Sequence, residues 1–211
     1  MRPENDPAGQ RSFIEQARRA QIVASAIEVI AEVGYAGASL AAIARHAGIS
    51  KGVISYHFAG KDELMETLVV DVYSDVAATV VERMETAATA TEKIRTHVVS
   101  VAAYMREHRS ALAALGQVFN NLREPDGKPR YGMHTNEVLF QVLEQLYLMG
   151  IAAGEFRELD TRVMAVTHNS AIDAMFGYWA VHPEIDVDAY ARSLADLLIH
   201  AAARTTPQGD R

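Results

Sequence analysis

Residues 39–58 read SLAAIARHAGISKGVISYHF, and this stretch decides the interpretation of the chain. Its apolar residues follow the helical period in two separate runs, Leu40, Ile43 and Ala44, then Val53, Ile54 and Phe58. Between the runs, Gly48 suits the left-handed backbone that ends a helix, and Ser50 can cap the next helix. The stretch therefore predicts two short helices joined by a tight turn. This is the helix-turn-helix pattern, whose second helix can enter the major groove of DNA.

The charge distribution agrees with this interpretation. No Asp or Glu occurs in 33–61, although the chain as a whole carries a formal charge of -7. Residues 1–61 hold seven Lys/Arg against five Asp/Glu, net +2, whereas 62–211 hold 13 against 22, net -9. The net-positive part is thus the part with the helix-turn-helix pattern. A DNA-binding surface must neutralise phosphates, so the charge supports the same function.

A longer stretch, 22–68, resembles the DNA-binding domain of the TetR family of transcriptional regulators. The resemblance is carried by Gly34-Tyr35, Ser39-Leu40, Ile43-Ala44, the run AGISKG at 47–52, Tyr56-His57-Phe58, Lys61 and Leu64. It implies a ligand-responsive repressor that works without a separate sensor protein. It also implies an all-α fold, with a helix-turn-helix domain followed by a larger helical domain and about nine helices in all.

The resemblance assigns contacts to single residues. It implies that Tyr56, His57 and Lys61 contact phosphates, and that Lys51, Gly52 and Ser55 lie nearest the base edges. Phosphate contacts fix the register on DNA, whereas base-edge contacts specify its sequence. The remaining residues of the predicted DNA-binding set are Ser39, Arg45 and Ser50. Many family members carry an aromatic residue or threonine at the position of Ser55, so its short side chain shifts sequence reading toward Lys51 and DNA shape.

Composition narrows the protein class. The 211 residues are 49% hydrophobic, which suffices for a substantial core, and there is no cysteine, so a disulfide framework is excluded. We find neither a signal peptide nor an uncharged apolar stretch of about 18 residues, and so expect a cytoplasmic protein. An enzyme is not expected: no cysteine nucleophile, glycine-rich phosphate loop or Gly-x-Ser-x-Gly motif occurs. No cofactor is expected either.

Helix signals divide the chain into four parts. We expect a mobile arm at 1–11, whose arginines, with Arg18 and Arg19 beyond it, could reach DNA. A DNA-binding domain at 12–61 follows, with Ser12 capping its first helix and Gly34 ending it. An effector-binding and dimerisation domain is expected at 62–204, and a disordered tail at 205–211. Helices of the larger domain are predicted at 62–86, 91–108, 110–122, 133–153, 161–181 and from 186 or 188 to 204.

A single helix-turn-helix domain makes few contacts with bases, so such regulators bind palindromic operators as two-fold dimers. In the family, the two helices that correspond to the last two here usually form the dimer interface. The candidate faces on those helices are Ala171, Met175, Phe176 and Trp179, then Tyr190, Leu194, Leu197, Leu198 and Ala201. Burial within one subunit is the alternative for each side chain.

The acidic body, residues 62–211, is larger than dimerisation requires, which predicts a small-molecule effector. Apolar bulk mixed with isolated polar groups is typical of a ligand pocket, and of an ordinary core edge as well. The candidate ligand-binding residues are Tyr104, Phe119, Asn120, Met133, Phe140, Glu144, Tyr147, His168, Asn169, Asp173 and Trp179. Eight methionines and the net charge, with Glu137, Glu144 and Asp173 as inward candidates, favour a lipophilic cation, as in multidrug sensing.

Two alternatives remain at this point. A metal-responsive regulator would need partners for His134 and Glu137, which share a helical face, or for His168. A ligand-independent architectural DNA-binding protein is disfavoured by the overall acidity, because such proteins rely on a broadly basic surface. The sequence names neither the effector nor the operator, nor whether one or two dimers bind it.

Overall fold

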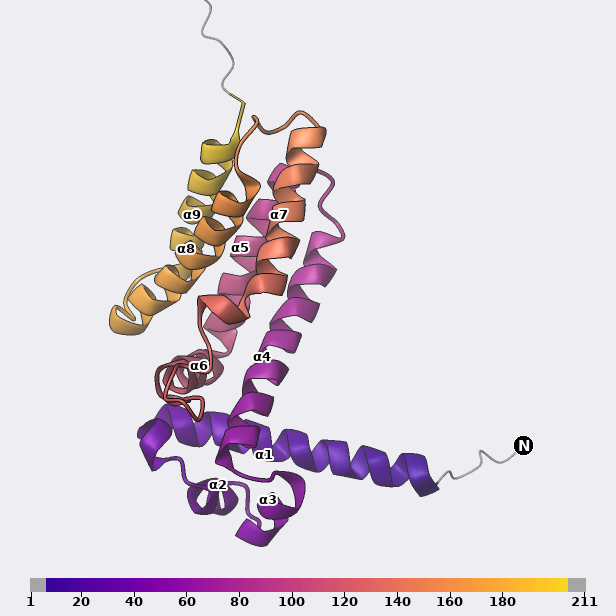
Figure 1. The fold of residues 1–211 in the computed structure, drawn as a ribbon, viewed down its shortest axis with the longest axis vertical. Helices are drawn as coiled ribbons and strands as arrows, with labels where there is room; N and C mark the ends of the chain where they lie inside the picture. The colour runs from indigo at the N-terminus through magenta and orange to yellow at the C-terminus, as the bar shows by residue number, and fades with distance from the viewer. Residues whose placement is uncertain (1–6, 205–211) are drawn as a thin grey trace, which may run out of the picture. The chain divides into compact units, whose positions relative to one another are not determined.

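The computed structural model describes residues 7–204 of the chain (Figure 1). Within that range the regular elements are nine α-helices and one short 3-10 helix, so the all-α prediction is confirmed. Contacts divide the chain into two compact units. The first comprises the chain up to Tyr73 together with Ser110–Arg130, and the second comprises Ser74–Arg109 together with the chain from Tyr131 onward. The functional division at residue 61 stays a prediction.

The first unit is built on helix α1, Pro7–Gly37. This helix already begins at Pro7, five residues before the predicted cap at Ser12, and the mobility of the arm stays a prediction. Residues 1–6 and the predicted tail at 205–211 lie outside the described residues. Gly34 interrupts the helix as predicted, because its φ of 74° places it in the left-handed region. Helices α2, Leu40–His46, and α3, Lys51–His57, follow.

An apolar core joins these three helices to the first part of α4, Lys61–Met84. Ile22, Ala26 and Ile30 of α1 are buried, and so are Ile43, Ile54, Phe58, Leu64 and Leu68. The segment 14–37 of α1 is long and apolar enough to cross a membrane by length and composition alone. A core helix of a soluble protein passes the same test, and Ile22, Ala26 and Ile30 of this segment are buried in the first unit.

Helix α6, Arg109–Asn121, and the loop after it complete the first unit from Ser110 onward. The predicted loop at 123–132 contains a tight hairpin, in which Arg123 and Pro129 form an antiparallel bridge and Gly127 takes a φ of 85°. Arg130 is bound to Glu124 at 2.7 Å within the hairpin and to Glu66 of α4 at 2.9 Å. The ring of Phe119 stacks on Tyr73, with centroids 6.3 Å apart.

The second unit contains the end of α4, α5 (Ala90–Glu107), α7 (Glu137–Ala152), α8 (Thr161–Val181) and α9 (Val187–Ala202). The helix predicted at 133–153 is divided: Met133–Thr135 form the 3-10 helix η1, and α7 begins only at Glu137. Side-chain caps start three of these helices. Asp160 caps α8 and Asp186 caps α9, and a capping box of Thr89 and Glu92 starts α5.

Helices α8 and α9 bury, inside the unit, much of the faces assigned above to a dimer. Met175, Phe176 and Trp179 of α8 and Leu194 and Leu198 of α9 are buried inside the unit. On α8 the exposed face carries residues outside the assigned set, namely Val163, Thr167, Ala174, Tyr178 and Val181. On α9, Tyr190, Leu197 and Ala201 of the assigned set are exposed. For the five buried side chains, the alternative of burial within one subunit is therefore the correct one.

Candidate functional site

The turn between α2 and α3 has the geometry that its sequence predicts. Gly48 takes a φ of 67°, and the amide of Ile49 donates to the carbonyl of Ala44 at 3.0 Å. Ser39 and Ser50 cap α2 and α3, because their hydroxyls accept the amides of Ala42 at 3.2 Å and Val53 at 3.3 Å. These bonds fix the position of α3 relative to α2.

The outer face of α3 carries most of the residues predicted to contact DNA. Ile54 is buried below, whereas Lys51, Gly52, Ser55 and Tyr56 are exposed. Tyr56 is 79% exposed, which is unusual for so large a ring. Ser39, Arg45 and Ser50 are exposed as well, on the N-terminal side of α3 and on α2. A polar, cationic surface with an exposed tyrosine is suited to phosphates and base edges.

His57 is half-buried at the end of α3, and its ring packs edge-on against Tyr56 with centroids 5.0 Å apart. Its Nδ1 atom is buried without a hydrogen-bond partner in the described part of the chain. The carbonyl of His57 accepts a hydrogen bond from Arg19 of α1. The Arg19 guanidinium also lies 4.1 Å above the Phe58 ring and 3.4 Å from the Glu63 carboxylate. Arg19 therefore holds the end of α3, a role that the sequence analysis missed because it requires the tertiary contact.

Lys61 has partners inside the first unit. Its ammonium group donates to the carbonyl of Tyr35 and lies 4.0 Å from the centroid of the Tyr35 ring. Burial lowers the pKa of Lys61, and the nearby Asp62 carboxylate opposes that shift. Lys61 thus ties the start of α4 to the loop after α1, and its predicted phosphate contact stays a prediction.

The eleven candidate ligand-binding residues are distributed over both units. Phe119 and Asn120 lie in the first unit, where Phe119 stacks on Tyr73 and the Asn120 carbonyl accepts a hydrogen bond from Arg123. In the second unit, Met133 is half-exposed in η1, and Phe140 belongs to a buried apolar cluster with Leu143, Leu146 and Ala165. Their assignment to one effector pocket stays a prediction.

The acids considered as counter-charges for a cation already have partners. Glu137 and Glu144 both pair with Arg162, at 2.7 Å and 3.5 Å. The Arg162 hydrogen bonds lower the pKa of Glu137. Asp173 is exposed and accepts a hydrogen bond from the buried Asn169 at 3.1 Å. These carboxylates are therefore less available to a ligand than the sequence suggested.

Tyr147 and His168 form a buried polar chain with His97. The Tyr147 hydroxyl lies 3.2 Å from Nδ1 of His168, and Nε2 of His168 lies 3.2 Å from Nδ1 of His97. Burial lowers the pKa of both imidazoles, to about 4 for His97 and well below the usual value for His168. The chain connects α5, α7 and α8.

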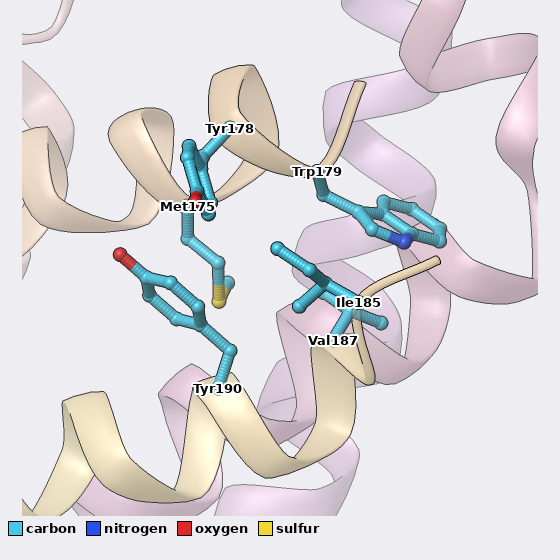
Figure 2. A pocket seen from close by; sticks show the side chains of 6 residues that line it. All are labelled: Met175, Tyr178, Trp179, Ile185, Val187 and Tyr190. Carbon is cyan, nitrogen blue, oxygen red and sulfur yellow. The ribbon is translucent and has the colours of Figure 1, made fainter. Parts of the chain in front are cut away.

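Trp179 lines an aromatic pocket between α8 and α9, shown in Figure 2. The other lining residues are Met175, Tyr178, Ile185, Val187 and Tyr190. Their side chains close the pocket so far that no space for a water-sized molecule remains. The guanidinium of Arg109 lies 4.5 Å from the centroid of the Trp179 ring, so one face of the indole already has a cationic partner.

Tyr104 lines a different and open site, a cleft of about 380 Å³ between the end of α4 and α5. The cleft is also lined by Asp75, Ala78, Thr79, Arg83, Glu107 and His108, none of which was among the candidates. The sequence contained an indication of part of this cleft. Tyr104 and His108 are four residues apart, the spacing that brings two side chains to the same face of a helix.

For the metal-responsive alternative, the structure shows where the candidate ligands lie. His134 is exposed in η1, and His168 is enclosed with His97 and Tyr147. In residues 7–204 no three side chains of His, Cys, Asp or Glu gather to hold a metal ion.

Comparison with known proteins identifies the helix-turn-helix region. Residues 22–68 match the family described as bacterial regulatory proteins, tetR family. The chain is 41% identical over 70 residues to the HTH-type transcriptional regulator BetI 2 of Chromohalobacter salexigens, which covers 33% of this chain but only 34% of that relative. It is 29% identical over 190 residues to the fatty acid metabolism regulator protein of Bacillus subtilis, covering 85% of this chain and 92% of the relative.

Solved structures share the fold over most of the chain. FadR of B. subtilis in complex with stearoyl-CoA superimposes with a TM-score of 0.75 at 24% identity, covering 85% of this chain and 97% of FadR. FadR of Bacillus halodurans gives a TM-score of 0.76 at 23% identity, covering 92% and 97%. With a capped helix-turn-helix and an exposed, cationic α3, these likenesses identify the chain as a member of the TetR family of DNA-binding transcriptional regulators.

Proposed function

We propose that this protein is a repressor that binds a palindromic operator as a homodimer in the cytoplasm and is released from it by a small lipophilic ligand. The observation that carries the DNA-binding part is the outer face of α3. There Lys51, Gly52, Ser55 and Tyr56 are exposed together, while Ile54 anchors the helix from below. Tyr56, His57 and Lys51 would fix the register on phosphates and base edges.

The exposed stripes of α8 and α9 support the homodimer. Leu197 is 68% exposed, and Val163, Tyr178 and Val181 are exposed on the neighbouring helix. Large apolar side chains aligned along two helices are typical of an interface between subunits. Two copies joined there would present their two helix-turn-helix domains to operator half-sites about 34 Å or more apart.

Release by a ligand requires that the ligand prefer the conformation that does not bind DNA. The polar cleft between α4 and α5 supports an effector site in the second unit. The full-length likeness to the fatty acid metabolism regulator, and to a FadR structure with stearoyl-CoA, supports an acyl compound as a competing effector class. An organic cation is the class that the composition favours.

Operator binding can be tested by fluorescence anisotropy with the purified chain and the DNA upstream of its own gene, at several salt concentrations. We expect selective binding over scrambled DNA that weakens as salt rises. Equal affinity for scrambled DNA at every salt concentration would contradict a sequence-specific repressor and favour the architectural alternative. Zinc or nickel added under chelator control tests the metal-responsive alternative in the same assay.

The dimer can be tested by analytical ultracentrifugation of Leu197→Glu. A buried carboxylate at the interface should shift the protein toward monomer and weaken operator binding by at least tenfold. Val81→Glu, at an exposed valine of α4 outside the two stripes, is the matched control and should remain dimeric. An unchanged mass for Leu197→Glu would exclude this face as the interface.

A further inference from the structure

The cleft between α4 and α5 has a chemistry more specific than an apolar pocket. All its lining residues belong to the second unit, with Asp75, Thr79 and Arg83 from α4, Tyr104 and Glu107 from α5, and His108 directly after α5. Its volume, about 380 Å³, falls within the usual range for sites that bind small molecules.

Tyr104 is the clearest sign that the cleft binds a ligand. Its side chain is only 7% exposed, yet its hydroxyl has no hydrogen-bond partner among residues 7–204. Among the described residues Nδ1 of His57 is the one fully buried polar side-chain atom without a partner, so the Tyr104 hydroxyl is still accessible from the cleft that the residue lines. Burial and the Asp75 carboxylate raise the pKa of Tyr104, so the phenol stays protonated. The cleft therefore offers an accessible hydroxyl, on an otherwise buried ring, to which a ligand can hydrogen-bond.

Hydrogen bonds inside the cleft determine which groups remain free. Nδ1 of His108 lies 2.8 Å from the Tyr104 carbonyl, which can only accept, so Nδ1 carries the proton and Nε2 is left as an acceptor. The His108 ring stacks on Tyr104 with centroids 4.0 Å apart, which holds it in that position. The Thr79 hydroxyl donates to the Asp75 carbonyl at 3.0 Å, so its oxygen too is left as an acceptor.

The carboxylates add to this excess of acceptors. Asp75 has no side-chain partner in the described part of the chain, and Glu107 is bound on one side by Arg106 at 3.2 Å. Arg83 alone brings a permanent positive charge to the cleft. Acceptors thus outnumber donors around Tyr104, with one more carboxylate than cation. Such a set recognises a positively charged group that carries N–H donors.

We propose that this cleft is the effector site and that it binds a protonated alkyl amine, with the ammonium group between Asp75, Tyr104 and Nε2 of His108. The proposal rests on the proposed function, since it identifies the ligand that would release the repressor. A quaternary ammonium has the same charge but no N–H to donate, and a carboxylate would be repelled by Asp75 and Glu107. The ligand class is therefore set by hydrogen-bond donors as well as by charge.

Isothermal titration calorimetry of the full-length protein with octylamine tests this, with octyltrimethylammonium and octanoate as probes of the same chain length. We expect octylamine to bind at least tenfold more tightly than either. Asp75→Asn should weaken octylamine binding about tenfold, and so should Tyr104→Phe, because each removes an acceptor of an N–H bond from the amine. Glu82→Gln, which removes an equal charge from an exposed site on the same helix outside the cleft, should have no effect.

Equal binding of octylamine by the wild-type protein and Asp75→Asn would overturn the proposal, as would tighter binding of octanoate or stearoyl-CoA. The anisotropy assay with upstream DNA, run on the same preparation, separates this result from the proposed function. Selective DNA binding without a response to octylamine refutes the amine site alone. Absence of selective DNA binding refutes the repressor itself, whatever the calorimetry shows.

Discussion

Nδ1 of His97 on α5 lies 3.2 Å from Nε2 of His168 on α8. His168 is completely enclosed, and its other nitrogen lies 3.2 Å from the Tyr147 hydroxyl of α7. The Tyr147 hydroxyl has no other partner among residues 7–204. Tyr147 must then donate to His168, and His168 to His97, if no buried proton is to be left unpaired. Three helices are thus joined by hydrogen bonds that require neutral imidazoles.

The stability of the protein should therefore fall in mild acid. Part of the His97 side chain is accessible, yet the surrounding protein excludes enough water to lower its pKa to about 4 from 6.5. Below pH 6.5 the unfolded chain binds more protons than the folded one, so the free energy of unfolding decreases as the pH falls toward 4. The loss from His97 is at most roughly 3 kcal/mol. Thermal denaturation between pH 7.5 and 4.5 measures it.

Variants separate this effect from general acid denaturation. His97→Gln should reduce the dependence of the melting temperature on pH below 6.5, because the amide cannot be protonated. His200→Gln, at an exposed histidine of α9, should keep the wild-type dependence. The same pH dependence in His97→Gln and the wild type would contradict the assignment.

Tyr56→Phe should weaken operator binding without affecting stability. The ring is 79% exposed and contributes little to the core, so removing its hydroxyl should leave the melting temperature within about 1 °C. A lost hydrogen bond to a charged phosphate is worth about 1.5 kcal/mol, or roughly tenfold in affinity. Anisotropy and thermal denaturation of one preparation measure both, and unchanged affinity would remove Tyr56 from the interface.

Two substitutions of Ser50 distinguish its structural role from its predicted DNA contact. Ser50→Ala removes the cap of α3 and should cost about 1 kcal/mol of stability. Ser50→Asp retains a capping oxygen and should keep the stability, but its negative charge should weaken operator binding by at least tenfold. If Ser50→Asp binds the operator as tightly as the wild type, Ser50 does not face the phosphates.

Gly150→Ala should destabilise the second unit. The ring of Phe156 occupies the position that an alanine Cβ would take, so the loop after α7 would have to move. Overpacking of this kind costs about 1–3 kcal/mol. Gly116→Ala on α6, where nothing lies within 4 Å of the added methyl, should be neutral or stabilising. Chemical denaturation compares the two, and equal stability of both variants would argue against the close approach.

Part of the site could be predicted because its signals are local in sequence. The caps at Ser39 and Ser50 and the left-handed Gly48 act on residues at most a few positions away. Tyr56 was included in the predicted DNA-binding set because a local motif resembles that of the TetR family, and the structure leaves its ring exposed on α3. By contrast, the partners of Arg19 lie 38 and 44 residues away, at His57 and Glu63. No pattern of neighbouring residues in the sequence predicts such a contact.

The effector region shows the same distinction more strongly. The sequence selected Glu137 and Glu144 as charges for a ligand, and the structure pairs both with Arg162. It did not select Asp75, Glu107 or His108, which line the open cleft. The spacing of apolar residues indicates which face of a helix is apolar, but it does not indicate which other helix packs against that face. The buried faces of α8 and α9 were assigned to a partner subunit for the same reason.

The sequence by itself thus determined the helical class, the helix-turn-helix and its family, because these follow from short-range backbone preferences and from the alternation of apolar and polar residues. Only the tertiary structure decided which polar groups were already satisfied and which, like the Tyr104 hydroxyl, were left free beside a cleft. The physical reason is that hydrogen bonding and desolvation depend on neighbours distant in sequence. Those neighbours exist only once the helices have packed.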